Sequence, residues 1–395
     1  MLRKFIELYE TEQKVKLLKI QLPVLLYTSP LPPRSTLVQL KRLGFLDELP
    51  KSLKKIRETI EEVEKLGDER VFRYRIEETM SELKTLLETG ERVVNDTFEL
   101  VNTISVTGAV MISALMILTN PELAPITVIF FAVISMILAV LVSLVKYPRE
   151  LAVPPPSRKY LLLYLISIPL YYFLGDTALS LLIPSLPLAL YSYLFLKKKI
   201  REVDFMESLL EKARACARAG INIYKCMEVE PKSLLEGFYG VLKAIAYSLY
   251  IIGVFGGERR VESLDKLQEV MTSYKTTFTR LRSRTSIVAL YSIISLIVAA
   301  VSFAMIVETN NMIAALKIPS SYGITLPSKA SVQALEFNMR ISLTVLAIGL
   351  SLVSALLREG RWEYFNIYMP FFLAVSSFSF TLSKQYIAPL LLGGF

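Results

Sequence analysis

Residues 274–303 read YKTTFTRLRSRTSIVALYSIISLIVAAVSF, and the two halves of this segment differ in chemical character. Its first half is basic, whereas its second half is apolar over a length that suits a membrane-spanning helix. No proline or glycine separates the halves, so the pattern predicts one helix that leaves an aqueous domain and enters a membrane. The rest of the chain is therefore expected to hold both aqueous and membrane-embedded parts.

Composition supports this division of the chain. Of the 395 residues, 53% are hydrophobic, which is typical of a membrane protein, and 21% are charged, which is too many for a chain buried wholly in lipid. The net charge is +9. It fits either a positive-inside bias with attraction to anionic lipid headgroups or a basic docking face for a protein. No nucleic-acid-binding motif accompanies the charge, so no nucleic-acid partner is expected.

The residues that catalysis most often uses are scarce. The chain has no histidine, which excludes Ser–His and Cys–His catalysis and histidine metal sites. No phosphate-binding lysine loop, dinucleotide fingerprint or HExxH motif is present. We therefore expect no enzyme, no cofactor and no metal. The two cysteines, Cys216 and Cys226, fall in a segment assigned below to the cytosol, so we expect reduced packing residues and no disulfide.

Hydropathy and helical periodicity predict an all-α, polytopic membrane protein with about seven spans and two cytoplasmic helical bundles. The expected spans are Ile104–Leu118, Ile126–Val145, Leu161–Leu174, Leu179–Leu196, Ile287–Val307, Ile341–Leu357 and Ile367–Leu382. The expected parts are an N-terminal amphipathic or linker segment 1–36, a soluble domain 37–103, a four-span block 104–199, a second soluble domain 200–285, and a C-terminal block 286–395 with an external loop 308–338.

Lysine and arginine cluster on one side of these spans, which predicts the orientation in a cell membrane. Thirteen basic residues fall on that side: Lys146, Arg149, Arg158, Lys159, Lys197, Lys198, Lys199, Arg201, Arg280, Arg282, Arg284, Arg358 and Arg361. The short connections on the other side, TNPELAP and GDTA, have none. We expect the N-terminus and both soluble domains in the cytoplasm. Seven spans place the C-terminus outside, and an eighth span would bring it back.

Glycines divide the second soluble segment into helices. Gly220 and the pair Gly256–Gly257 are expected to stop helices. The apolar run AIAYSLYIIGVF, residues 244–255, is shorter than a span, which favours a buried core helix. For residues 1–36, two interpretations stay open, a helix on the membrane surface and the first helix of the soluble domain.

Residues 209–231, LLEKARACARAGINIYKCMEVEP, and 236–258, EGFYGVLKAIAYSLYIIGVFGGE, resemble the type II secretion system F family. Its members are inner-membrane platform proteins of type IV pili, type II secretion and the archaellum. The residues that fit the family pattern are Leu210, Arg218, Gly220, Ile221 and Ile223. The resemblance is best over 200–305, and the extra span pair Leu161–Leu196 is similar to the archaeal branch.

The resemblance implies a non-enzymatic platform that couples a secretion-type assembly ATPase to pilin-like subunits, in contact with membrane lipids and with a possible homodimer. A basic helix continuous with a span would be a stiff connection to that ATPase. The candidate ATPase-docking residues are Arg259, Arg260, Lys275, Arg280, Arg282 and Arg284. Headgroup anchoring is the alternative role for the last three.

Two other functions stay open. One is a transporter or channel with cytoplasmic regulatory domains, which charged or broken span centres would favour. The other is a membrane-anchored scaffold unrelated to filaments, which only the identity of its partners distinguishes from a platform.

Overall fold

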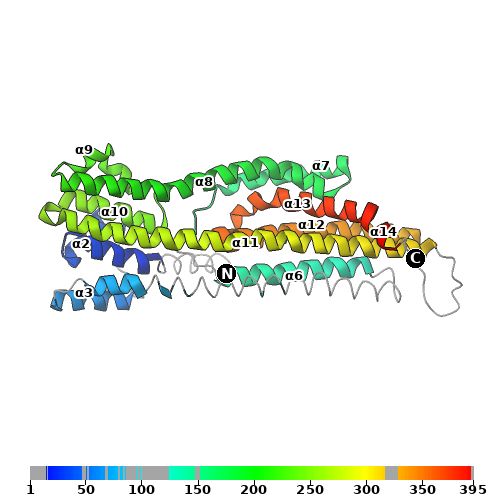
Figure 1. Cartoon of the computed structure of the whole chain (residues 1–395), viewed down its shortest axis with the longest axis horizontal. Helices are drawn as coiled ribbons and strands as arrows, with labels where there is room; N and C mark the ends of the chain where they lie inside the picture. Colours follow the sequence, from blue (N-terminus) through cyan, green and yellow to red (C-terminus); the bar gives the residue numbers. More distant parts are fainter. Residues whose placement is uncertain are drawn as a thin grey trace. The chain divides into compact units, whose positions relative to one another are not determined.

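The computed structural model describes residues 17–46, 53–66, 70–78, 124–146, 152–315 and 328–392, with a few single or paired positions between these ranges. Every regular element in them is helical (Figure 1), which confirms the all-α class. The chain divides into two compact units. Unit 1 contains the described residues of 1–88, 148–154 and 197–281, and unit 2 those of 89–147, 155–196 and 282–395. Parts of both expected soluble domains therefore belong to unit 1.

Unit 1 is built around the apolar run of residues 244–255. Its elements are a helix over Leu17–Thr28, α2 (Pro33–Arg42), α3 (Lys54–Leu66), a helix over residues 70–78, the end of α8 (Thr177–Arg218), α9 (Ile223–Met227), η4 (Pro231–Leu235), α10 (Gly240–Phe255), η5 (Gly257–Arg259) and the start of α11 (Arg260–Ala315). Most of α10 is buried, and it ends where the glycine pair follows. The prediction of a core helix stopped by glycine is confirmed.

The helix over Leu17–Thr28 is part of the core of unit 1. The side chains from Ile20 to Thr28 are all buried. Gln21 donates a hydrogen bond of 2.5 Å to the carbonyl oxygen of Gly240, and Thr28 bonds to Ser248 on α10 at 2.8 Å. Of the two interpretations left open for residues 1–36, this packing agrees with the first helix of the soluble domain, and residues 17–28 are not a linker. A helix packed on all sides needs apolar residues all round rather than on one face.

The expectation of two separate, reduced cysteines was also wrong. Cys216 and Cys226 form a disulfide, and their Cα atoms are 6.2 Å apart. The chain reverses between them because α8 ends at Arg218 and Gly220 takes a φ of +72°, which a residue with a side chain rarely adopts. The predicted helix stop at Gly220 is thereby confirmed, and the turn that it makes brings the two cysteines together.

Unit 2 holds the apolar helices. Its elements are α6 (Ala124–Lys146), η3 (Arg158–Ile166), α7 (Ser167–Leu174), the start of α8, the end of α11, α12 (Lys329–Glu359), η6 (Trp362–Tyr364), α13 (Phe365–Leu382), the π-helical turn η7 (Ser383–Ile387) and α14 (Ala388–Leu392). Helix α12 packs against α6 and α13. It has buried side chains along most of its length, so it is the central helix of the unit.

Four helices of the described ranges are long and apolar enough to cross a membrane: Thr177–Arg218, Ile287–Ala315, Lys329–Glu359 and Trp362–Leu390. This is consistent with a membrane protein. The expected number of seven spans is not confirmed. The span expected at Ile104–Leu118 lies outside the described residues, and the one expected at Leu161–Leu174 is divided between η3 and α7.

The expected bounds of the external loop, 308–338, include residues that are helical in the structure. Helix α11 continues to Ala315, and α12 already begins at Lys329. Polar residues fit inside these helix ends because their side chains bond to the helix itself. Asn310 and Asn338 each donate to the carbonyl oxygen four residues earlier, at 2.7 and 2.9 Å. The polar residues alone therefore predicted a loop that is longer than the segment between α11 and α12.

Helices α8 and α11 each contribute residues to both units. Helix α11 supplies residues 260–281 to unit 1 and 282–315 to unit 2 without an interruption of the helix (Figure 1). It contains no glycine or proline over its 56 residues. Helix α8 is also continuous, although Pro184 and Pro187 lie inside it. The predicted continuity of residues 274–303 is confirmed, and the continuity of α8 was not anticipated.

The contact between α6 and α12 gives a direct test of unit 2. A Cβ atom at Gly349 of α12 would overlap the side chain of Met136 on α6. We expect Gly349→Leu to lower the free energy of unfolding by about 1–3 kcal/mol, because overpacking forces neighbouring side chains from their preferred rotamers. Thermal unfolding of the purified protein in detergent would measure this. Ala330→Leu, at an exposed position of α12, is the control, and equal melting temperatures for the two variants would contradict the packing.

Candidate functional site

The basic residues predicted to dock a partner lie in different surroundings. Arg259, in η5, and Arg280, on α11, are exposed. Arg260 begins α11 and is half-buried near Tyr224. Burial raises the pKa of the Tyr224 hydroxyl, and the charge of Arg260 opposes that rise. The side chain of Arg284 lies outside the described residues. Among the candidates whose side chains the structure describes, Arg259 and Arg280 are the exposed ones.

Lys275 is held within unit 1. Its ammonium group donates to the carboxylate of Glu207 and lies 3.0 Å from Asp204 Oδ1, both on α8. The hydrogen bonds to Glu207 and then Asp204 raise the pKa of Lys275, because they stabilise its charged form. Lys275 thus joins α11 to α8.

Arg282 is held within unit 2 by a buried carboxylate. Its Nη1 and Nη2 atoms lie 2.8 and 3.3 Å from the two oxygens of Glu359, at the end of α12. The side chain of Glu359 is 1% exposed and that of Arg282 17%. The Tyr368 hydroxyl of α13 donates to the same carboxylate at 3.3 Å. A two-pronged arginine–carboxylate pair of this kind is both strong and geometrically specific, so it fixes α11 to α12 and α13.

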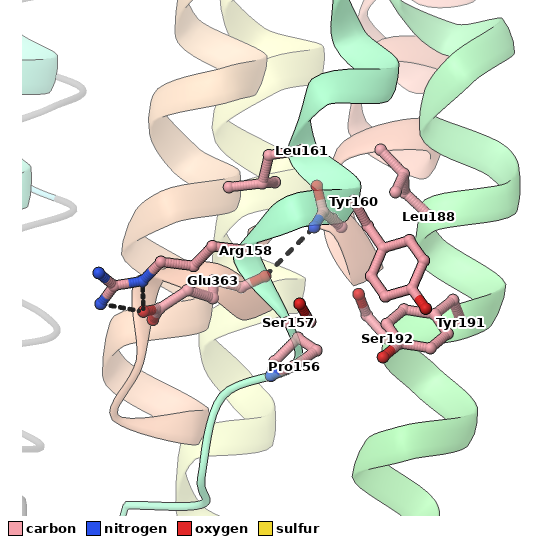
Figure 2. A pocket seen from close by; sticks show the side chains of 10 residues that line it. Pro156, Ser157, Arg158, Tyr160, Leu161, Leu188, Tyr191, Ser192 and Glu363 are labelled. Carbon is pink, nitrogen blue, oxygen red and sulfur yellow. Dashed lines mark hydrogen bonds and ion pairs between the residues drawn. The ribbon is translucent and has the colours of Figure 1, made fainter.

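A second buried carboxylate follows four residues later. Glu363, in η6, is 2% exposed, and Arg158 of η3 donates to its Oε1 atom from Nε at 3.0 Å and from Nη2 at 2.9 Å. Figure 2 shows the two side chains directed toward each other. The guanidinium of Arg158 also lies 5.8 Å from the centre of the Trp362 ring, a cation–π distance. This pair fixes η3 to the turn between α12 and α13.

A small cavity lies beside the second pair. Figure 2 shows Tyr160, Tyr191 and Ser192 on its far side. It offers about 10 Å³ for the centres of water molecules, which is room for about one water. An organic substrate does not fit a space of this size. The pair between Arg158 and Glu363, which borders this cavity, therefore has a structural role that joins η3 to η6.

Four charged side chains also meet in unit 2. Arg340 of α12 donates to Glu336 at 3.1 Å and lies 3.8 Å from Asp176. Lys384, in η7, donates to the same Glu336. Asp176 in addition accepts from the first backbone N–H groups of α8, at 2.8 and 3.0 Å. This group of four charges joins the start of α8, α12 and η7.

The residues that carry the family resemblance lie where a helix ends and a short helix follows. Leu210 and Ile223 are buried, and Arg218 lies 3.5 Å from Asp265 on α11. Gly220 makes the turn described above. Ile221 is about half exposed. The order of helix, glycine and short helix that suggested the resemblance is present in the structure.

The sequence missed the role of Glu359 and Glu363. Both belong to REGRWEYF, residues 358–365, which lies between the expected spans Ile341–Leu357 and Ile367–Leu382. One available signal was the pair of glutamates at a four-residue spacing among aromatic residues. Their arginine partners lie 77 and 205 residues away in the sequence, so no local pattern could identify them.

The pair between Arg282 and Glu359 can be tested by a double-mutant cycle. We expect Arg282→Leu to lower the free energy of unfolding by about 3–5 kcal/mol, because it removes the closest cation from a buried carboxylate and leaves only Arg358, 3.8 Å away. Adding Glu359→Leu is expected to restore most of this loss. Thermal unfolding in detergent measures both steps. Glu58→Gln, which removes an exposed ion pair with Lys54, is the control, with an expected loss below about 1 kcal/mol. Additive losses from the two leucine substitutions would contradict the coupling.

No family model matches the chain, and neither a curated protein nor a solved structure matches it. The family resemblance of residues 200–305 therefore stays a prediction, and no function is transferred to the chain from a relative.

Proposed function

We propose that this chain is the non-enzymatic membrane platform of a type IV pilus-like or archaellum-like machine. In this proposal it couples a cytoplasmic assembly ATPase to the insertion of pilin-like subunits into a filament. The observation that carries the proposal is the unbroken helix α11, whose residues belong to a unit rich in charged helices and to a unit of apolar helices. A stiff helix transmits displacement because bending it without a proline or glycine is costly.

The ion pairs give this helix attachment points. Within unit 1, Lys275 is bound to α8, and within unit 2, Arg282 is bound to α12 and α13. A force applied to unit 1 would thus reach the apolar helices through side chains that are fixed on both elements. The exposed Arg259 and Arg280 supply positive charge that an acidic ATPase surface would recognise.

The proposal includes the membrane orientation. Basic residues that flank the apolar helices favour a cytoplasmic position for unit 1. The aromatic ring of Trp362, partly exposed beside Arg158, suits the region of lipid headgroups. Lipid contact at this turn, a cytoplasmic ATPase and pilin-like subunits are the partners that we propose. Whether two copies associate is a separate question for the same purification.

One observation favours a transporter or channel instead. Glu336, Arg340 and Lys384 lie in helices that could cross a membrane, and charges in spans often mark paths for ions or protons. They are paired with each other and with Asp176, which directly precedes α8. Such pairing also has a purely structural explanation, so we rank this function second.

The partners of the chain test the proposal. The tagged full-length protein would be purified gently from its native membrane, and bound proteins identified by mass spectrometry. We expect a secretion-type ATPase together with pilin-like subunits. Their reproducible absence, from cells shown to express such a system, would reject the platform. Small-molecule and ion flux through reconstituted protein would then be measured for the transporter.

A single substitution can test whether the function needs a continuous α11. Ser283→Pro removes a backbone donor and places a ring against the preceding turn, so it should kink or break the helix. We expect loss of filaments in electron micrographs while the amount of protein in the membrane stays unchanged. Ser283→Ala keeps a good helix former at the site and is the matched control. Normal filaments in the proline variant would contradict the role of a stiff α11.

A further inference from the structure

The disulfide between Cys216 and Cys226 differs in accessibility at its two ends. Cys216 lies in the last turn of α8 and is 4% exposed, whereas Cys226 lies on α9 and is exposed. The end of the bond at Cys226 is therefore the end more open to an attacking thiolate. In the cytoplasmic position that the proposed function requires, the bond faces a pool of reducing thiols, where disulfides are mostly transient or regulatory.

We propose that this disulfide is a thiol-exchange site that reversibly latches α9 to α8. A thiolate of the glutathione class attacks Cys226 Sγ, the S–S bond breaks, and Cys216 leaves as a thiolate that takes up a proton. A second thiolate attacks the outer sulfur of the mixed disulfide and releases Cys226 as a thiol. Two small thiols are oxidised to one small disulfide, and the protein disulfide is reduced to two thiols. Oxidised glutathione reverses the sequence.

Helix α9 keeps other attachments when the bond is open. The side chain of Asn222 accepts from the backbone N–H of Tyr224 at 3.0 Å and caps the helix. The Tyr224 hydroxyl donates to the carbonyl oxygen of Tyr250 at 2.8 Å. Ile223 and Met227 are buried. Opening the bond therefore loosens a local element and leaves the fold of unit 1 in place.

Helix α9 lies against the C-terminal end of α10. The Tyr224 ring lies so close to Gly253 of α10 that a Cβ atom there would overlap it. Val254 and Phe255, the next residues of α10, are already partly exposed. Movement of α9 would uncover more of this apolar helix end, directly before the exposed Arg259. The latch would thus control an apolar and basic surface at the start of α11.

Closing a loop of this length in the unfolded segment suppresses local opening on the order of a hundredfold. The full-length protein in detergent would be equilibrated with mixtures of reduced and oxidised glutathione. Alkylation and mass spectrometry report the state of the cysteines, and hydrogen exchange reports α9 and α10. We expect reduction without denaturant, and exchange of residues 223–227 that rises about a hundredfold, while residues 241–252 stay protected.

Three results would overturn the latch: resistance of the bond to reduction until the protein unfolds, unchanged exchange of α9 after reduction, or loss of protection in α10. Cys226→Ser is the matched control, and its α9 should exchange fast under both conditions. The titration of the wild-type protein with glutathione mixtures tests the latch even if Cys226→Ser folds poorly. The measurement uses no filament partner, so its failure is distinguishable from failure of the proposed platform function.

Discussion

A carboxylate buried among apolar helices is the constraint on which unit 2 depends. Glu359 is almost fully enclosed, and an enclosed charge is very unfavourable unless an opposite charge and hydrogen bonds compensate it. Arg282 and Tyr368 supply both. Arg282 lies on α11 and Tyr368 on α13, whereas Glu359 lies on α12. The bonds to this one carboxylate therefore hold three helices together. Arg158 pairs with one oxygen of the buried Glu363 and so joins η3 to η6.

This constraint changes the meaning of the positive charge in the sequence. Arg158 and Arg282 follow the positive-inside pattern, but each is also the partner of a buried acid. Lys275 is held by two carboxylates of α8. Part of the net charge therefore supports internal packing, and Arg259 and Arg280 are exposed candidates for docking. The unbroken α11 passes from the attachment at Lys275 to the attachment at Arg282 within about two helical turns.

Those features of the fold that depend on short segments of the chain were correctly predicted from the sequence. The core helix α10 and the stop at Gly220 follow from hydropathy and from the conformational freedom of glycine. The ion pairs, the disulfide and the burial of residues 17–28 depend on contacts between distant segments, which no window along the chain contains. The length of the loop 308–338 was overestimated because the side chains of Asn310 and Asn338 donate hydrogen bonds to carbonyl oxygens of their own helices. The docking role of the basic residues remains a prediction.

The most direct test of the account is the distance between two spin labels along α11. Cysteines would be introduced at the exposed positions Thr276 and Leu290 in a chain whose native cysteines are replaced by serine, with the protein in a lipid bilayer. Fourteen residues of unbroken helix predict a narrow distribution near ~21 Å between the helix positions. A broad distribution or a clearly shorter distance would show a hinge between Lys275 and the span, and would contradict a stiff connection.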